Sequence, residues 1–277
     1  MTLLLVDIGN TRVKWARLSD GRMGRLYAAA NSGWGAGDYA RRVLGKRWRI
    51  GAHGATATTG AENGHRSATQ RDRVIVSSVA GSQVAARLVA AARQVGAPTP
   101  EFVTSSRSAA GVTTAYLEPW RLGVDRFVAA IGAHHLASGQ PVCVVNIGTA
   151  MTIDLVDGRG RHLGGAIVPG PQLMVNSLLA KTQGIQRRAR GGARDRGSLF
   201  ARTTRSAIGQ GALYAAAATI DRSVEEARLQ LGTRPLILLT GGGSAAVKPL
   251  VQNTCVSVPE LVLHGLAVWA RHRRAGS

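Results

Sequence analysis

The chain has 277 residues, of which 45% are hydrophobic and 18% charged, so it can bury a full core and is neither a disordered tail nor a coiled coil. Its length allows one large domain or two small ones. Aromatic residues make up only 4%, which argues against a stacking platform for single-stranded nucleic acid. The 2 cysteines, Cys143 and Cys255, exclude a disulfide scaffold and a four-cysteine zinc site.

The formal net charge of +20 is carried almost entirely by arginines scattered along the chain. A basic stretch, residues 187–205, concentrates arginines against the single acid Asp195. It could steer anionic small molecules as easily as hold nucleic acid. The sequence has no run of about eighteen apolar residues, and its N-terminus does not resemble a signal peptide. We therefore expect no membrane span and a cytoplasmic location.

The first half of the chain alternates strand and helix patterns, which predicts an α/β fold. The predicted elements are an apolar strand at 3–7, a glycine turn at 8–11, an alternating strand at 13–18, a turn at 20–21, a helix with loops within 33–73, a buried strand at 74–78, and a helix at 82–95 with Ser82 as its N-cap.

The second half repeats the layout of the first. An apolar strand beginning at Pro141 reaches Asn146-Ile147-Gly148, a small polar turn and a second strand follow, and a turn at 157–159 closes the unit. In this repeat Asp7 aligns with Asn146, which predicts two similar lobes, residues 1–121 and 122–277. The elements expected after it are a helix near 205–230, a strand at 236–239, a glycine turn at 240–244, and a helix from Glu260.

The glycine turns indicate phosphate binding, because glycine lets the backbone approach a ligand and exposed N–H groups hold phosphate oxygens. Two such turns facing each other would clamp a nucleotide. None is a Walker A loop, and none is a GxGxxG sequence opening a helix. Each turn alone is weak support, but the ordered set with its repeat is much stronger.

These motifs together resemble the type III pantothenate kinases, a family of the acetate and sugar kinase/Hsp70/actin superfamily with two ribonuclease H-like lobes. The resemblance spans nearly the whole chain, and the motifs that carry it are DIGNTRVK at 7–14, VSSV at 76–79, GVDR at 123–126, NIGTAMTID at 146–154, GGAIVPG at 164–170, TTRSAIGQG at 203–211, LTGGGS at 239–244 and LVLHGL at 261–266. It implies ATP-dependent phosphorylation of the primary hydroxyl of pantothenate, the first step of coenzyme A biosynthesis, by a homodimer.

The resemblance implies an ATP-binding set in three segments. Asp7 corresponds to the family's acid near hydrated Mg²⁺, and Thr149 belongs to the second phosphate turn. The remaining members of the set are Ile8, Gly9, Asn10, Thr11, Arg12, Val13, Lys14, Gly241, Gly242 and Gly243.

Asp125 is the candidate general base, because an attacking alcohol must lose a proton and a carboxylate within hydrogen-bond reach can accept it. Arg126 beside it can orient a polar or carboxylate group through its fork of donors. The resemblance adds Gly123, Val124 and Tyr116 to the pantothenate site, and Thr204 from the partner subunit. The alternatives are a surface Asp-Arg pair before a helix, a half-buried aromatic and a helix N-cap.

Asn146 departs from the family pattern, where an aspartate binds a monovalent cation, K⁺ or NH₄⁺. An asparagine keeps an acceptor oxygen but loses the charge, which weakens a cation site. The cation is then dispensable, or Asn146 hydrogen-bonds across the gap that the ion would fill. Both versions predict a shallow potassium dependence.

The sequence thus predicts a pantothenate kinase that takes ATP, pantothenate and Mg²⁺, with no nucleic-acid binding beyond non-specific contacts. Two alternatives stay open. One is another small-molecule kinase of the same superfamily. The other is a non-catalytic regulatory or accessory factor, which the high positive charge would fit. Formation of ADP and phosphopantothenate from ATP and pantothenate would separate the three.

Overall fold

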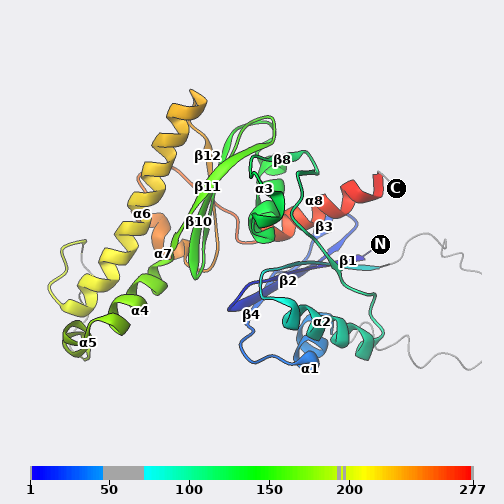
Figure 1. Ribbon diagram of the computed structural model, residues 1–277, viewed down its shortest axis with the longest axis horizontal. Helices are drawn as coiled ribbons and strands as arrows, with labels where there is room; N and C mark the ends of the chain where they lie inside the picture. Colours follow the sequence, from blue (N-terminus) through cyan, green and yellow to red (C-terminus); the bar gives the residue numbers. More distant parts are fainter. Residues whose placement is uncertain (1, 46–71, 192–194, 196–197, 276–277) are drawn as a thin grey trace, which may run out of the picture. The chain divides into compact units, whose positions relative to one another are not determined.

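The computed structural model describes residues 2–45, 72–191, 195 and 198–275, which form two compact units (Figure 1). Unit 1 comprises Met1–Ser106, Trp120–Val128 and Val262–Ser277, and unit 2 comprises Arg107–Pro119 and Ala129–Leu261. The expected boundary at residues 121 and 122 falls within unit 1, because the chain crosses between the units more than once. Residues Val262–Ser277 belong to unit 1, whereas the lobes expected from the sequence are two continuous segments that place these residues in the second lobe.

Unit 1 is built on a mixed sheet in the order β3-β2-β1-β5-β6, with β4 paired to β2. Its strands are β1 (Thr2–Ile8), β2 (Arg12–Ser19), β3 (Arg22–Met23), β4 (Tyr27–Ala30), β5 (Arg73–Ser78) and β6 (Glu101–Phe102). Strand β1 runs antiparallel to β2 and parallel to β5. In this register Asp7 lies opposite Lys14 on β2 and opposite Ser77 on β5.

Helices cover the sheet of unit 1. They are α1 (Ala36–Tyr39), the π-helical turn η1 (Ala40–Leu44), α2 (Ser82–Val95), the short η3 (Pro119–Arg121), and α8 (Leu261–Ala275), while α3 (Val124–Ala137) starts in unit 1 and continues into unit 2. One face of β1, with Leu4, Val6 and Ile8, packs in a cluster with Tyr39 and Leu88. Leu3 and Leu5, on the other face of β1, are buried as well, as expected of a central strand covered on both faces.

Unit 2 contains a sheet in the order β13-β12-β9-β10-β11-β8-β7. Its strands are β7 (Ser108–Ala109), β8 (Val112–Thr114), β9 (Val142–Ile147), β10 (Ala150–Val156), β11 (Arg161–Pro169), β12 (Leu236–Thr240) and β13 (Val256–Ser257). Its helices are α4 (Pro171–Lys181), α5 (Gln183–Ala189), α6 (Thr204–Leu231), α7 (Ser244–Val247) and the turn η4 (Lys248–Leu250).

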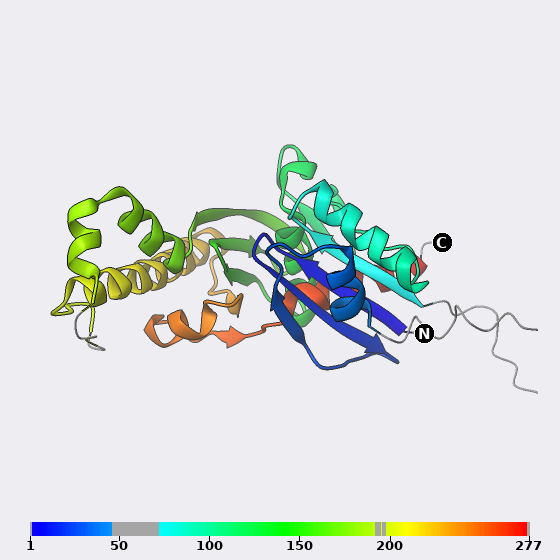
Figure 2. The same cartoon turned by 90° about the horizontal axis from the view of Figure 1, so that it is seen from below.

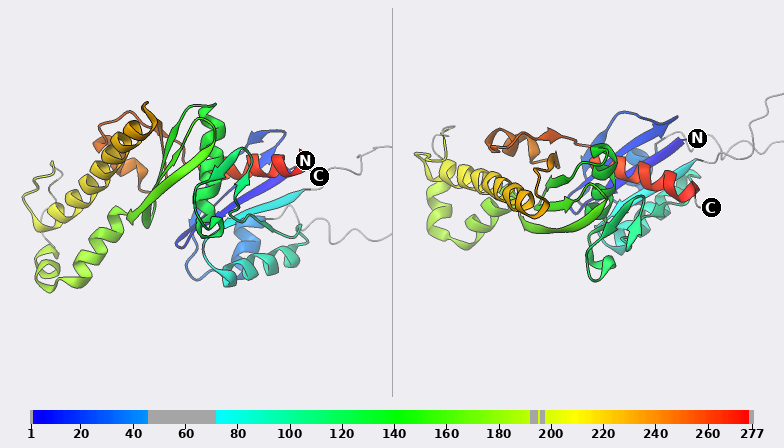
Figure 3. Two further views of the ribbon diagram at one scale, coloured as in Figure 1. Left: turned by 45° about the horizontal axis from the view of Figure 1, so that its top comes forward. Right: turned by 90° about the horizontal axis from the view of Figure 1, so that it is seen from above.

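The long helix α6 packs through one stripe. Ala216, Ile220 and Val224 lie at helical spacing in one cluster with Val145 and Ile147 of the sheet. The first part of α6 runs beside α4 and α5 instead (Figure 2 and Figure 3). Helices α4 and α5 contain no buried residue. Helices α4 and α5 therefore do not enclose a hydrophobic core.

The two sheets repeat one arrangement, which confirms the internal repeat predicted from the sequence. In each, a buried strand ends in a glycine turn, returns as an antiparallel strand, and has a parallel strand on its other side: β1 with β2 and β5, and β9 with β10 and β12. Asn146 lies opposite Thr240 as Asp7 lies opposite Ser77. The α/β fold class is confirmed by these sheets.

The predicted strands and long helices agree with the observed ranges, but the structure also contains elements that were not predicted, among them β11, α4 and α5, and it differs in the following details. Ser82 is the first residue of α2 rather than its cap, because Gly81 precedes the helix with φ +84° and no side chain caps it. The expected helix within 33–73 is the pair α1 and η1, and residues 46–71 lie outside the described part. Strand β4, an alanine-rich segment, was not predicted.

Candidate active site

The turn after β1 holds its backbone in a defined loop. The Gly9 N–H donates to the Arg12 carbonyl at 2.9 Å, which closes the turn between β1 and β2. Asn31 braces it: its side-chain amide donates to the Gly9 carbonyl at 3.2 Å, and its N–H donates to the Thr11 carbonyl at 3.2 Å. Asn10 and Thr11 are exposed at the tip. The turn is therefore a rigid surface of small polar residues, as phosphate binding requires.

Asp7 lies at the base of this turn. Burial raises the pKa of its carboxyl from 3.8 to about 7, Lys14 opposes the rise, nearby Asp125 adds to it, and the Ser77 hydroxyl lowers it. A carboxyl in this state gains from any cation that binds beside it. The sequence-predicted residues Asp7, Lys14 and Asp125 thus influence one another electrostatically within unit 1.

Asp125 stands in the first turn of α3, where the helix dipole favours a negative charge. Its Oδ1 accepts the Arg126 N–H at 2.9 Å, and the Phe127 N–H donates to the Gly123 carbonyl at 2.9 Å. A Cβ on Gly123 would lie 2.8 Å from Asp125 Oδ1, so glycine leaves room for this carboxylate. Arg126 is buried, with 5% of its surface exposed, which differs from the surface Asp-Arg pair considered as an alternative.

Unit 2 brings the second and third predicted turns together. The Gly243 N–H donates to the Ile147 carbonyl at 2.9 Å. Gly241 has φ +91°, and a Cβ there would lie 2.4 Å from the Ile147 carbonyl oxygen and 2.6 Å from Asn146 Oδ1. A side chain at Gly241 would therefore collide with the 146–149 turn. The 241–243 turn and the 146–149 turn, which stand in separate sequence motifs, therefore pack against each other.

The exposed Thr149 is held from a third segment. The Gly170 N–H donates to the Thr149 carbonyl at 2.9 Å. A Cβ on Gly170 would lie 2.1 Å from the Gly148 carbonyl oxygen. The end of β11 thus packs against the second phosphate turn.

The two remaining substrate candidates also lie in unit 2. Tyr116 is half-buried in the loop after β8. Thr204 is the first residue of α6, and the cap of that helix is Thr203, whose hydroxyl accepts the Ser206 N–H at 3.2 Å. The N-cap of α6 is therefore Thr203, and the alternative role considered for Thr204, that of N-cap, is filled by Thr203.

A divalent cation near Asp7 would need oxygen ligands from a bound substrate as well as from the protein. Among the described residues no group of three or more His, Cys, Asp or Glu could hold a metal ion. Mg²⁺ commonly keeps several waters and uses one or two carboxylates together with substrate phosphates. Asp7, with its raised pKa beside a phosphate-type turn, fits that donor set.

Sequence reasoning did not single out three residues that shape these turns: Asn31, Ser77 and Gly170. Asn31 and Ser77 act through side chains that reach β1 from other elements. The motifs VSSV and GGAIVPG contain Ser77 and Gly170, so the motifs were the available signal for two of the three. Asn31 carried none.

Solved structures share this fold. A Campylobacter jejuni structure described as a Baf family transcriptional activator has a TM-score of 0.54, 15% identity, and coverage of 98% of this chain and 99% of that one. Component A of the (R)-2-hydroxyglutaryl-CoA dehydratase of Acidaminococcus fermentans has a TM-score of 0.51, 12% identity, and coverage of 100% of both. The chain shares the two-sheet α/β fold of these structures.

Sequence similarity identifies the family within this fold. Residues 3–226 match the sequence profile of the type III pantothenate kinases. The type III pantothenate kinase of Nitrosococcus oceani is 34% identical over 269 residues, covering 96% of this chain and 92% of the relative. That of Stenotrophomonas maltophilia strain R551-3 is 36% identical over 272 residues, covering 98% of each. The chain belongs to the type III pantothenate kinase family.

Proposed function

We propose that the chain transfers the γ-phosphoryl group of ATP to the primary hydroxyl of pantothenate, giving ADP and 4′-phosphopantothenate, the first step of coenzyme A biosynthesis. The observation that carries this proposal is membership of the type III pantothenate kinase family over residues 3–226. The glycine turns and the two interacting carboxylates, Asp7 and Asp125, supply the groups that such a transfer needs.

Asp125 acts as the general base. In the transfer, the hydroxyl oxygen of pantothenate bonds to the γ-phosphorus, its proton passes to the Asp125 carboxylate, and the bond to the β,γ-bridging oxygen breaks. Asp125 lies in the first turn of α3, where the helix dipole favours a negative charge. The buried guanidinium of Arg126 orients the polar groups of pantothenate.

The ATP phosphates lie on backbone N–H groups of two turns. In unit 1 the proposal assigns Gly9–Lys14 to the ATP phosphates. In unit 2 it assigns Thr149 to a phosphate and the Gly241–Gly243 turn to the adenosine. Asp7 would hold hydrated Mg²⁺, and the bound ion would supply positive charge to the phosphate oxygens. The monovalent cation, K⁺ or NH₄⁺, is dispensable because Asn146 provides an oxygen without a charge.

We infer a homodimer in which Thr204 of one subunit contacts pantothenate bound to the other. The support is the surface of unit 2 around α4, α5 and the start of α6, where apolar side chains are exposed: Ile167 at 62%, Leu173 at 38%, Leu178 at 40% and Phe200 at 87%. A second copy of the chain that packed on this part of unit 2 would bury these exposed apolar side chains. The cytoplasmic location expected from the sequence remains a prediction. The structure adds only that no helix in its described ranges suits a membrane span.

The experiment that tests the proposal is product identification. The purified chain is incubated with ATP, Mg²⁺ and one of several small hydroxy acids, pantothenate among them, and the products are identified by mass spectrometry. The proposal requires phosphopantothenate as the main product. A phosphorylated product from a different alcohol, with none from pantothenate, would favour another kinase of the superfamily.

The regulatory alternative makes a different prediction about nucleic acid. On our proposal, the exposed arginines Arg187, Arg188, Arg190, Arg202 and Arg205 of the basic stretch attract ATP and the pantothenate carboxylate. DNA binding should then be weak and be lost between about 50 and 200 mM salt. Sequence-specific binding that persists at physiological salt would favour a regulatory factor.

A further inference from the structure

A buried polar network lies directly beneath Tyr116, at the end of β8. Strand β8 pairs in parallel with β11, and Thr114 lies opposite His162 in that register. The Thr114 hydroxyl oxygen is 3.3 Å from His162 Nδ1, and His162 Nε2 is 2.8 Å from Asp154 Oδ1. The Tyr116 N–H donates to the Thr114 hydroxyl oxygen at 3.2 Å. A chain of contacts therefore connects Asp154 on β10 with the Tyr116 backbone.

The residues in this series of contacts are almost fully buried, which is unusual for polar side chains. His162 is 0% exposed, and Asp154 and Thr114 are each 2% exposed. Polar groups taken from water are costly unless each finds a partner, so a buried acid and histidine in contact constrain each other's geometry. With the proton on Nε2 directed to Asp154, Nδ1 is an acceptor for the Thr114 hydroxyl. The hydroxyl oxygen is then oriented toward the Tyr116 N–H.

Arg107 fixes the same loop through the backbone carbonyls. Its Nη1 donates to the carbonyls of Thr114 at 3.1 Å and Tyr116 at 2.8 Å, and its Nη2 donates to that of Leu117 at 3.0 Å. The guanidinium is a planar fork, so three carbonyls on one fork fix the path of the loop. Both the N–H and the carbonyl of Tyr116 are thus bound by side chains.

The Tyr116 side chain is oriented as well. Its ring centroid lies 5.8 Å from that of His162, with the planes tilted by 40°. The ring rests on the buried histidine while the residue stays half-exposed. The position and the direction of Tyr116 therefore depend on residues that lie beneath it, and none of the proposed substrate contacts includes them.

We infer that Arg107, Thr114, Asp154 and His162, the Thr114 network, are positioning residues that preorganise Tyr116 for pantothenate. The inference rests on the proposed function, in which Tyr116 contacts pantothenate. A loop that is ordered before the substrate arrives avoids the entropy cost of ordering on binding. The network therefore sets the KM for pantothenate and leaves ATP binding, which uses other turns, unaffected.

The sharpest test removes one hydroxyl. Thr114→Val keeps the β-branched shape but deletes the oxygen that receives the Tyr116 N–H, whereas Thr114→Ser keeps the oxygen. We expect Thr114→Val to raise the KM for pantothenate about 5- to 20-fold, as loss of one or two hydrogen bonds implies, with the KM for ATP unchanged. Thr114→Ser should stay near wild type. Thr113→Val, at the exposed neighbour on the same strand, is the matched control.

A second variant covers the case in which Thr114→Val fails to fold. Arg107 is exposed, so Arg107→Met keeps the stem and removes three hydrogen bonds without opening the core. It should raise the KM for pantothenate in the same way. In a Tyr116→Ala background, either substitution should add less than about twofold, because residues that act through Tyr116 lose their effect with it.

The outcomes separate the inference from the proposed function. A wild-type chain that does not phosphorylate pantothenate overturns both. An active wild type whose Thr114→Val and Arg107→Met variants keep the KM for pantothenate overturns the inference alone. Equal rises in the KM for ATP and for pantothenate, or full additivity with Tyr116→Ala, also overturn it, because they indicate general disruption rather than positioning.

Discussion

Single side chains decide the chemistry of unit 1, where two carboxylates lie close enough to influence each other. Burial raises the pKa of Asp7 to about 7, and the charge of Asp125 contributes to that rise. Asp125 itself stands at a helix N-terminus, which favours its charged form. The two acids therefore stand in different surroundings, in line with the different tasks proposed for them, Asp7 beside a cation and Asp125 as a proton acceptor.

Asp125→Asn should remove the proton acceptor while keeping the size of the side chain. We expect kcat to fall about 10²- to 10⁴-fold with little change in the KM for ATP, measured by steady-state kinetics. Asp20→Asn, the same substitution at an exposed turn of unit 1, is the control. A near-normal kcat in Asp125→Asn would remove Asp125 from the role of base.

Asp7→Asn should change how stability depends on pH. The pKa of Asp7 is about 7 in the folded chain against an ordinary 3.8, so the folded state holds the proton more tightly than the unfolded state. Its contribution is present at acidic pH and is lost as the pH rises from about 4 to about 7. Asparagine resembles the protonated acid. The Tm of Asp7→Asn should therefore match that of wild type near pH 4.5 and exceed it at pH 8.

Asp20→Asn again provides the control, and thermal unfolding at several pH values provides the measurement. A constant Tm difference across this pH range would show that Asp7 does not titrate as described. Loss of activity in Asp7→Asn is expected at every pH, because asparagine holds Mg²⁺ poorly.

Asn146 should leave the wild type with a shallow response to potassium. The Asn146 amide oxygen lies close to the backbone of Gly241, and it carries no charge where the family resemblance implies a cation-binding aspartate. KCl is titrated against choline chloride at fixed ionic strength. Asn146→Asp should acquire or steepen the potassium response. A wild type that is nearly inactive without potassium and saturates at low millimolar levels would contradict this prediction.

At the scale of helices and strands, the pattern of apolar residues was sufficient for the elements that are buried on one or both faces. β1, β5, β9, β12 and α6 all agree with their predicted ranges because burial imposes period 2 or 3.6 on the sequence. The cap of α2 was wrong because Gly81 supplies a positive φ that a serine side chain cannot replace. β4 was missed because alanines carry little strand preference and pair only through the backbone.

The candidate site was predictable where it lies in contiguous motifs and unpredictable where it depends on contacts between distant segments. The turns at 9–14 and 241–243 stand in single motifs. The brace from Asn31 spans 22 residues to Gly9, and the contact between His162 and Thr114 spans 48. A strand register brings such residues together, and one sequence alone does not fix that register.

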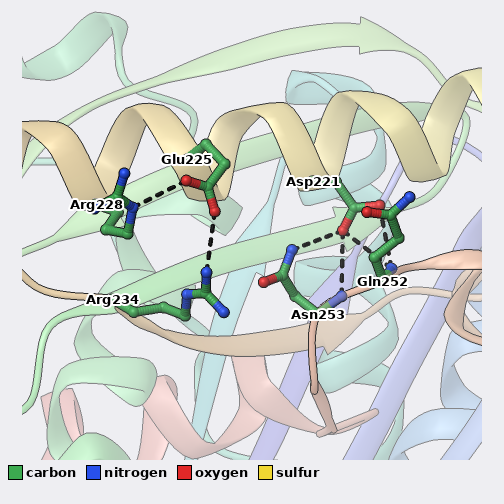
Figure 4. A network of polar contacts seen from close by, with 6 residues as sticks. All are labelled: Asp221, Glu225, Arg228, Arg234, Gln252 and Asn253. Atoms are coloured by element: carbon green, nitrogen blue, oxygen red, sulfur yellow. Dashed lines mark hydrogen bonds and ion pairs between the residues drawn. The ribbon is translucent and has the colours of Figure 1, made fainter.

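Helix α6 is attached to the loop after η4 by one carboxylate. Asp221 Oδ1 accepts the side-chain amide of Asn253 at 2.8 Å, and its carboxylate oxygens also accept the N–H groups of Gln252 and Asn253 at 3.1–3.3 Å (Figure 4). Asp221→Ala should lower the free energy of unfolding by about 1–2 kcal/mol, because several charge-assisted bonds are lost together.

Glu225, one turn further along α6, is the matched control in the same thermal unfolding experiment. It forms exposed ion pairs with Arg228 at 2.9 Å and Arg234 at 3.2 Å (Figure 4). Such pairs contribute little in water, so Glu225→Ala should leave the Tm nearly unchanged. A larger effect at Glu225 than at Asp221 would contradict this ranking.

The whole molecule combines two units that repeat one strand-turn-strand arrangement but carry different residues at equivalent positions. Asp7 near the end of β1 and Asn146 near the end of β9 occupy matching places, one an acid and one its neutral amide counterpart. Each unit contributes a glycine turn, and Asp125 and Tyr116 come from different units. The repeat thus places an acid in one unit and a neutral amide in the other at equivalent positions, each before a glycine turn.

The rate of ADP formation by the purified chain, with ATP and Mg²⁺ in the presence and absence of pantothenate, tests the central claim most directly. The account predicts turnover on the order of 1 s⁻¹ or faster that requires pantothenate and falls to background in Asp125→Asn. ADP formation that is equal with and without pantothenate, or absent in both, would contradict the assignment of pantothenate as the substrate.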